Sequence, residues 1–315
     1  MRRPKRLTLP AWLALALPGA CVRPPPPPLP PSLPQPVVSR RLAPEVRVHA
    51  MRVGFVQVRP THYEGEGASL LRTLRIISEG DWSPWLPIIV FAVEHPEGTI
   101  LVDTGLSRDI ALDPETGSPR GGLGWFYENH LRFFLPSGDD LGARLEEVGL
   151  GLEDVDQVVL THLHADHTGN LSRLSQAEVW TGEGNWPSHL GSVWPPGTKP
   201  PRLVPDGAVG TSYALTEDGL VRIVRLPGHT QGHIGVSVVG SSCRVLMAGD
   251  ATFDAAQTDR RGVSGISEDL ALARMTQERL RSLPPHTLLL PSHDQGVFAR
   301  FAETGRPPAR TEMTP

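Results

Sequence analysis

The chain has 315 residues, enough for one large domain or two ordinary ones. Its formal net charge is −4, and its one basic cluster lies at the extreme N-terminus, so composition argues against a protein that binds nucleic acid. The two cysteines, Cys21 and Cys243, cannot build a disulfide framework, so any bound metal must be held by histidine and carboxylate side chains.

Residues 1–21 have the layout of a secretory signal. Basic residues at positions 2, 3, 5 and 6 precede a short apolar stretch, Leu7–Leu17, which is too short for an ordinary membrane-spanning helix. The small residues before Cys21 also resemble the end of a bacterial lipoprotein signal, in which the cysteine is lipidated. We therefore expect export, either to the periplasm or to a membrane through a lipidated Cys21. The alternative is a cytoplasmic protein whose translation starts near Met51.

A proline-rich linker is predicted at residues 22–44. Its main part, Arg23–Pro36, reads RPPPPPLPPSLPQP and cannot build a hydrophobic core. Such a segment forms a stiff polyproline II spacer of roughly 3 Å per residue. We place a single folded α/β domain at residues 45–315, because no internal repeat or second linker divides it.

Strands and helices alternate along this domain. Short runs rich in Val, Ile and Leu predict strands at Arg47–Val58, Pro87–Glu94, Thr99–Asp103, Gln157–Thr161, Glu178–Thr181, Val221–Leu226, Ile234–Val239, Arg244–Ala248 and Thr287–Pro291. Amphipathic spacing and capping residues predict helices at Asp139–Val148, Ser267–Leu283, where Ser267 is the expected N-cap, and Asp294–Glu303.

The segment Val158–Leu171, VVLTHLHADHTGNL, contains four candidate metal ligands within six residues: His162, His164, Asp166 and His167. His162 and His164 alternate, so at the end of a strand their side chains point the same way. Asp166 and His167 follow in a turn and face a different direction. Because imidazole and carboxylate groups bind zinc and similar divalent ions, one segment is predicted to serve two neighbouring ions.

Three further candidate ligands follow later strands. They are His229 in LPGHTQGH, Asp250 in VLMAGDATF and His293 in LLLPSHD. Each lies just beyond an apolar strand, where α/β folds place their chemistry. His233, in the same GHTQGH motif, is expected to brace the loop rather than to bind metal.

Together, HxHxDH, GHTxGH, GD and SHD resemble the metallo-β-lactamase-fold hydrolase superfamily, and Val102–Gly105 resembles its early VDTG turn. The resemblance covers about Val53–Asp294. It implies a four-layer αβ/βα sandwich of two mixed β-sheets flanked by helices, in the α/β (α+β) class. It also implies a dinuclear metal site at one edge, between the two sheets.

By match of motif, the resemblance assigns the ligands to two ions: His162, His164 and His229 to one, Asp166, His167 and His293 to the other, with Asp250 bridging. Asp103 is expected to fix a ligand histidine through a hydrogen bond. The implied cofactors are two divalent ions, with zinc expected and iron, cobalt or manganese as alternatives. A hydroxide shared by the ions would attack the substrate, and Asp166 would orient it or move a proton.

Features of the chain narrow the substrate class. Asp250 counts against the zinc β-lactamases, which generally lack an aspartate there. The 42 residues between Asp250 and His293 leave no room for the domain that nucleases of this superfamily insert, and the 22 that follow His293 are too few for the helical region of glyoxalase II. The remaining resemblance is to N-acyl-homoserine lactone lactonases, through EHPEGTILVDTG, GDATF and LLLPSHD. We predict hydrolysis of a small-molecule lactone or related ester.

One residue departs from the lactonase pattern. Lactonases of this group commonly have tyrosine three places after the bridging aspartate, and this chain has Phe253. Loss of a hydroxyl that stabilises the developing oxyanion costs a few kcal/mol. A thioester, phosphodiester or β-lactam substrate therefore stays open, as does a metal-binding accessory lipoprotein without turnover.

Aromatic residues upstream of the motif could line an apolar pocket or belong to the core: Trp82, Trp85, Trp125, Phe126, Phe133 and Phe134. The segment Thr181–Pro201, rich in Gly, Trp and Pro, is a candidate loop beside the entrance.

Overall fold

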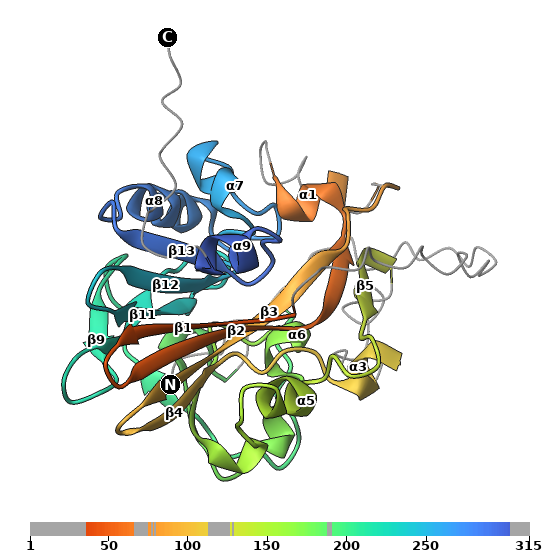
Figure 1. Ribbon diagram of the computed structural model, residues 1–315. Coiled ribbons are helices and arrows are strands. Elements are labelled where there is room, and N and C mark those ends of the chain that lie inside the picture. The colour runs from red at the N-terminus through yellow and green to blue at the C-terminus, as the bar shows by residue number, and fades with distance from the viewer. Residues whose placement is uncertain are drawn as a thin grey trace, which may run out of the picture.

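Two mixed sheets face each other, and each carries helices on its outer face, giving four layers (Figure 1). The computed structural model describes residues 36–65, 75, 76, 78, 80–112, 127, 129–187 and 191–302. The four-layer sandwich predicted from the sequence is confirmed. The predicted leader and nearly all of the proline tract lie outside the described residues.

The first sheet has eight strands in the order β1-β2-β3-β4-β6-β7-β8, with β5 paired to the end of β2. Its first four strands are antiparallel, and β4, β6, β7 and β8 run parallel. The bounds are β1 Val37–Ala43, β2 Val46–Val58, β3 Leu86–His95, β4 Gly98–Val102, β5 Leu131–Phe134, β6 Val155–Val159, β7 Glu178–Gly182 and β8 Arg202–Val204.

The second sheet has five strands in the order β13-β12-β11-β10-β9. Only its β12–β13 pair is parallel. The bounds are β9 Ser212–Ala214, β10 Val221–Arg225, β11 Ile234–Val239, β12 Arg244–Gly249 and β13 Thr287–Pro291.

The central strands are buried on both faces, which explains their nearly continuous hydrophobic sequences. In β2, Ala50 belongs to the core between the two sheets, whereas the next residue, Met51, belongs to the core beneath the helices of the first sheet. A third, smaller cluster around Leu246 and Leu280 lies on the outer face of the second sheet.

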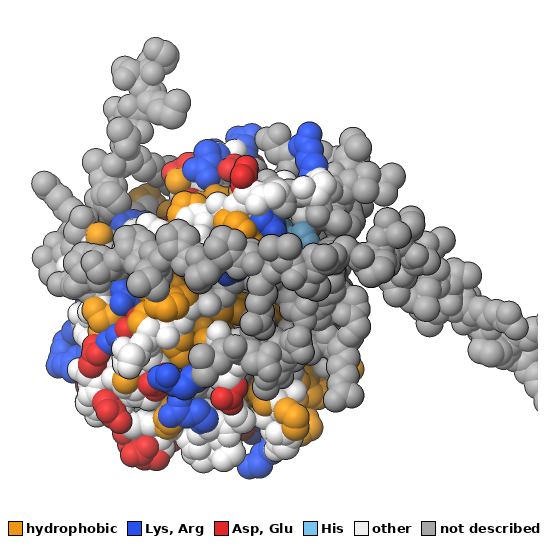
Figure 2. Space-filling view, turned by 90° about the vertical axis from the view of Figure 1, so that its right-hand side faces the viewer, with side chains coloured by type: hydrophobic (Ala, Val, Ile, Leu, Met, Phe, Trp, Pro, Cys, Tyr) orange, Lys and Arg blue, Asp and Glu red, His pale blue; other side chains and the backbone are white. Residues whose placement is uncertain are grey.

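The helices are short. α5 and α6 lie outside the first sheet and α8 outside the second (Figure 1). α9 packs against the edge strands β1 and β13, and its Val297, Phe298 and Phe301 belong to the core between the sheets. The bounds are α1 Pro60–Tyr63, α3 Arg108–Leu112, α5 Leu141–Glu146, α6 Ala165–Thr168, α7 Ala255–Asp259, α8 Leu270–Arg281 and α9 Val297–Ala302, with 3-10 turns η2 Leu152–Asp154, η3 Leu171–Arg173 and η4 Glu183–Asn185. Within the described ranges, none of these helices has the length and hydrophobicity needed to cross a membrane. Basic and acidic side chains are interspersed on the face shown in Figure 2.

The predicted linker ends too late. Strand β1 lies inside residues 22–44 and pairs with β2 in register from Val37↔Met51 to Ala43↔Val46, so the folded domain begins before residue 45. Val38 and Leu42 are buried in the core between the sheets, which is why this segment folds despite the prolines before it. Met51 lies in the middle of β2, so a chain starting there would lack β1 and the beginning of β2.

Two predicted helices begin later than expected. Asp269, not Ser267, caps α8, because its carboxylate accepts hydrogen bonds from the Ala271 and Leu272 amides at 2.8 and 3.0 Å. α9 starts at Val297 rather than Asp294. The Asp294 carboxylate accepts from the amides of Ala255 and Gly296 and contacts Arg300, which fixes it before the helix. The helix predicted at 139–148 is confirmed in shorter form as α5.

Helix α1 carries a fully buried histidine. The His62 ring stacks on His130, with centroids 5.6 Å apart and planes at 19°. Burial, the neighbouring His130 and the Arg59 guanidinium lower the pKa of His62 to about 3. His62 is therefore neutral in the folded protein at neutral pH.

His62 should make the folded state acid-sensitive. In the unfolded chain the pKa of His62 is 6.5, so between pH 6.5 and about 3 only the unfolded state binds this proton. The free energy of unfolding therefore decreases as the pH is lowered through that range. The loss is about 2 kcal/mol between pH 6.5 and 5. The variant His62→Phe keeps a ring against His130 but cannot bind the proton. Between pH 6.5 and 5 its free energy of unfolding, measured in urea, should therefore decrease by about 2 kcal/mol less than that of the wild type. Equal losses in both proteins would contradict this role.

Candidate metal centre

The seven predicted ligands lie at the ends of four strands, where the two sheets meet. His162 and His164 follow β6, and Asp166 and His167 occupy the short helix α6 directly after it. The other three residues follow strands of the second sheet: His229 after β10, Asp250 after β12 and His293 after β13. The structure thus brings together every residue that the sequence singled out as a ligand.

One group is formed by His162, His164, His229 and Asp250, whose ligand atoms all lie within 4.8 Å of one another. His164 Nδ1 lies 2.8 Å from His162 Nε2 and 3.2 Å from His229 Nε2. Ligand atoms on one tetrahedral zinc ion lie about 3.3 Å apart. The spacing therefore fits nitrogen atoms that surround one cation.

A second group is formed by Asp166, His167 and His293. Asp166 Oδ2 lies 3.5 Å from His293 Nε2 and 3.8 Å from His167 Nε2. Asp250 connects this group to the first. Its Oδ1 lies 3.3 Å from His167 Nε2 and 3.2 Å from His293 Nε2, and its Oδ2 lies 3.6 Å from His229 Nε2. Asp250 is therefore placed to offer one oxygen to each group.

Hydrogen bonds outside the groups set the tautomers of two ligand histidines. His167 Nδ1 donates to Asp103 Oδ2 at 2.8 Å, and His293 Nδ1 donates to the Pro87 carbonyl at 2.9 Å. In each ring the Nε2 lone pair is then available toward the centre. Asp103 was predicted to fix a ligand histidine, and its contact with His167 confirms this.

Asp103 is held by its own strained backbone and by Thr161. Its φ is +62°, in the left-handed region that non-glycine residues rarely occupy. Its carboxylate accepts hydrogen bonds from the Thr161 amide at 2.8 Å and the Thr161 hydroxyl at 2.9 Å. These contacts direct the remaining lone pairs of Asp103 at His167.

His233 lies beside the groups but belongs to neither of them. It is fully buried, and its Nε2 accepts a hydrogen bond from the Asp250 amide at 3.1 Å. This contact agrees with the prediction that His233 braces a loop.

The electrostatics of the centre favour a cation. Burial and the imidazoles of His167 and His164 hold the pKa of His162 well below its usual value. Burial also opposes charge on His167 and Asp250. However, Asp103, Asp250 and Asp166 together raise the pKa of His167, and His293 and His167 keep the pKa of Asp250 well below its usual range. Among the described residues, the buried atoms His167 Nε2 and Asp250 Oδ1 contact only other polar atoms of the centre and make no hydrogen bond outside it. A donor set of this kind fits divalent metal ions.

Helix α8 holds two ligand-bearing loops from outside. The Thr276 hydroxyl donates to the Pro227 carbonyl at 2.6 Å, and the Gln277 amide donates to the Ala251 carbonyl at 2.9 Å. Gly228 has a φ of +133°, and a Cβ there would lie 2.3 Å from the Ala273 backbone nitrogen. The loop that carries His229 therefore packs directly on the helix backbone.

Aromatic residues surround the centre on one side. Phe253 is buried and stacks on His293, with ring centroids 5.3 Å apart. Its ring also lies edge-on to those of Tyr63 and His229, at 5.4 and 6.5 Å. The Tyr127 hydroxyl donates to the Gly191 carbonyl at 2.7 Å, and a Cβ at Gly191 would lie 3.0 Å from His164 Nε2. The predicted entrance loop thus does reach the centre. Tyr63 and Tyr127 were missed because no motif surrounds them in the sequence.

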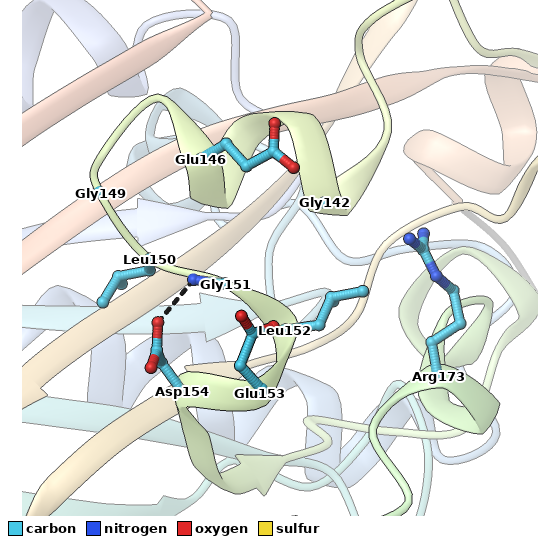
Figure 3. A pocket seen from close by; sticks show the side chains of 9 residues that line it. All are labelled: Gly142, Glu146, Gly149, Leu150, Gly151, Leu152, Glu153, Asp154 and Arg173. Atoms are coloured by element: carbon cyan, nitrogen blue, oxygen red, sulfur yellow. Dashed lines mark hydrogen bonds between the residues drawn. The ribbon is translucent and has the colours of Figure 1, made fainter.

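Most of the other candidate pocket aromatics are structural. Trp85 packs on Phe134, and Phe133 packs against the core. Trp82 lies between the guanidinium groups of Arg59 and Arg132, at 3.7 and 4.0 Å. Trp125 and Phe126 lie outside the described residues. A separate hollow of about 450 Å³ lies between α5 and η2, lined by residues such as Glu146, Glu153 and Arg173 (Figure 3). It contains none of the seven ligands.

Comparison with known proteins gives a match along most of the folded part. A family model described as the metallo-beta-lactamase superfamily matches residues 84–293. A probable metallo-hydrolase of Mycobacterium bovis is 31% identical over 189 residues, which cover 55% of this chain and 59% of that protein. The chain thus spans less than two thirds of that relative. The N-acyl homoserine lactonase AttM of Azorhizobium caulinodans is 25% identical over 233 residues, 69% of this chain and 85% of that protein.

Solved structures share the fold. A variant of B. thuringiensis AiiA, with N-decanoyl-L-homoserine bound at its active site, has a TM-score of 0.63 and 18% identity, covering 78% of this chain and 92% of that one. AidC, described as a dizinc quorum-quenching lactonase, has a TM-score of 0.54 and 15% identity, covering 82% and 90%. At these identities the likeness concerns the fold alone.

Asp103 should control metal affinity without touching a metal. Asp103→Asn keeps the side-chain shape but removes the negative charge that holds His167, so the affinity of the chain for zinc should fall about 10- to 100-fold. Competition with a chromogenic chelator measures this. The matched control is Asp109→Asn, at an exposed position on α3. Equal affinities in the two variants would show that the contact with His167 does not tune the centre.

Proposed function

We propose a function from one premise: the chain belongs to the metallo-beta-lactamase superfamily. On this basis it is a hydrolase that uses two divalent metal ions, with zinc as the expected metal, to open a lactone or a related ester. The observation that carries the proposal is the position of Asp250, with one oxygen near each of the two ligand groups.

In this proposal the ligand groups divide as the motif match predicted. One ion would be held by His162, His164 and His229, and the other by Asp166, His167 and His293, while Asp250 would serve both groups. Such ions, when bound, would lower the pKa of a water molecule at the centre and polarise the carbonyl oxygen of a substrate. Membership of the superfamily and the lactonase relatives support hydrolysis, and the dizinc neighbour AidC supports zinc.

The chain's own residues would position the reactants. The Asp166 side chain is 12% exposed, compared with 5% for Asp250, so it is the carboxylate better placed to meet an entering water. We assign to Asp166 the orientation of that water. As the water adds to the carbonyl carbon, it would give a proton to Asp166. The ring C–O bond then breaks as the tetrahedral adduct collapses, and Asp166 would pass that proton to the leaving alkoxide.

The residue at position 253, a phenylalanine, affects which substrates are preferred. Its ring packs between Tyr63 and His293 and offers no hydroxyl to a developing oxyanion. This favours esters and lactones that need no donor at this position over N-acyl homoserine lactones as the preferred substrates. A thioester, phosphodiester or β-lactam substrate, and a metal-binding protein without turnover, are the outcomes to be tested against this proposal.

Activity should depend on the metal and on Asp166. Treatment with a chelator should abolish hydrolysis of a panel of lactones and aryl esters, and zinc should restore it. Asp166→Asn should lower kcat by at least about 100-fold, because it removes a charged ligand from the centre. The matched control, Asp259→Asn at an exposed position of α7, should behave like the wild type.

This proposal fails if the metal-loaded protein hydrolyses no member of a panel that also contains thioesters, phosphodiesters and β-lactams. Turnover that survives both chelation and Asp166→Asn would place the chemistry elsewhere.

Restoring the missing phenol should shift specificity. Phe253→Tyr should raise kcat/KM for homoserine lactones by about tenfold, because a single donor to the oxyanion is worth up to a few kcal/mol. Hydrolysis of activated aryl esters should change much less, since their leaving groups need less assistance. A parallel change for both substrate classes would show that position 253 does not control the choice of substrate.

A further inference from the structure

A second, smaller cavity lies on the outer face of the second sheet, beside α8. It has a volume of about 80 Å³ and is lined from β9, β10, β11, β12, β13 and α8. None of the metal-centre residues lines it, so its chemistry is independent of the hydrolytic site.

The cavity has an uncompensated positive charge. Arg222, Arg244 and Arg279 line it, and no acidic residue does. Within the part of the chain that the structure describes, none of the three forms an ion pair. By contrast, Arg261 and Arg281, near the same helix, both pair with Glu278. Three guanidinium groups without counter-ions around one cavity favour an anionic ligand.

Two hydroxyl groups in the cavity also lack partners. Ser237 is 6% exposed, and its hydroxyl makes no hydrogen bond with any described residue. The buried Thr287 hydroxyl likewise has no partner among the residues described. Ser237 is paired across the sheet with Arg222, and Thr287 with Arg244. The register places each of these residues beside an arginine of the neighbouring strand, so a ligand with several acceptor oxygens in the cavity meets hydroxyl and guanidinium donors together.

The floor of the cavity is apolar. Leu246 and Leu280 are 2% and 3% exposed, and Val224 and Leu283 complete the surface at the edge of α8. An inorganic oxyanion gains nothing from such a surface, whereas an alkyl chain does.

From this combination we propose that the cavity binds the carboxylate of a short aliphatic acid. The carboxylate oxygens accept hydrogen bonds from the arginines and from Ser237, and the alkyl chain packs on Leu246 and Leu280. The size of the cavity limits the enclosed part of the ligand to a few non-hydrogen atoms. The fork of a guanidinium matches a carboxylate in two parallel hydrogen bonds.

Isothermal titration of the full-length, metal-loaded protein with hexanoate tests this site. We expect saturable binding with a dissociation constant on the order of 1 mM. Arg279→Gln and Arg244→Gln should each weaken binding roughly tenfold, since each removes a charge-assisted hydrogen bond. The matched control is Arg274→Gln, on an exposed position of α8 that does not line the cavity, and it should bind like the wild type. Ser237→Val should also weaken binding, and thermal unfolding checks that each variant is folded.

Two comparison ligands test which chemical groups the cavity recognises. Hexan-1-ol should not bind, because it lacks the charge, and inorganic phosphate should bind at least roughly tenfold more weakly, because it lacks the alkyl chain. The proposal is overturned if hexanoate shows no saturable binding. It is also overturned if hexanoate binds all arginine variants equally, as it would at the metal centre, or if phosphate binds as tightly as hexanoate.

Discussion

A buried polar group needs a hydrogen-bond or charge partner, and this requirement determines how the side chains are arranged where the two sheets meet. Five imidazoles and two carboxylates converge there, and five of these seven side chains are buried. Desolvation alone would exclude charge from such a cluster. The fold meets the requirement in two ways: the rings of His167 and His293 are fixed by the hydrogen bonds that they donate to Asp103 and to the Pro87 carbonyl, and the inward-facing atoms form a candidate site for cations.

The sandwich architecture is what allows two groups to form side by side. The first sheet supplies residues to both groups from one strand end, because β6 leads directly into α6: His162 and His164 belong to one group, and Asp166 and His167 to the other. The second sheet supplies one ligand from each of three strand ends. Asp250 joins the two groups, and its loop is held by the buried His233 on one side and by Gln277 of α8 on the other. Ligand geometry therefore depends on how the sheets pack, and not on one loop alone.

Local patterns in the sequence were enough to predict most strands and to single out the seven side chains that the structure brings together. HLHADH contains four candidate ligands in one short motif, and His229, Asp250 and His293 each follow an apolar run that the structure confirms as a strand. Prediction failed where long-range contacts decide the outcome. β1 lies in a segment classed as linker by its prolines, and it folds because Val38 and Leu42 meet the second sheet. The start of α8 depends on which of several polar residues caps it, and sequence spacing did not distinguish Asp269 from Ser267. Tyr127 reaches Gly191 across 64 residues, a contact that no local pattern reports.

The packing of α8 on the ligand loops has a consequence for how such a protein can diverge. Gly228 admits no side chain, because the backbone of Ala273 occupies the space a Cβ would need, and Thr276 and Gln277 hold the adjoining carbonyls. The separation between His229 and Asp250 is therefore encoded partly in a helix that contributes no ligand. Substitutions along α8 can shift that separation gradually, whereas replacement of a ligand abolishes it in one step. Substitutions in α8 could therefore change metal preference or reactivity during evolution while the seven candidate ligands stay the same.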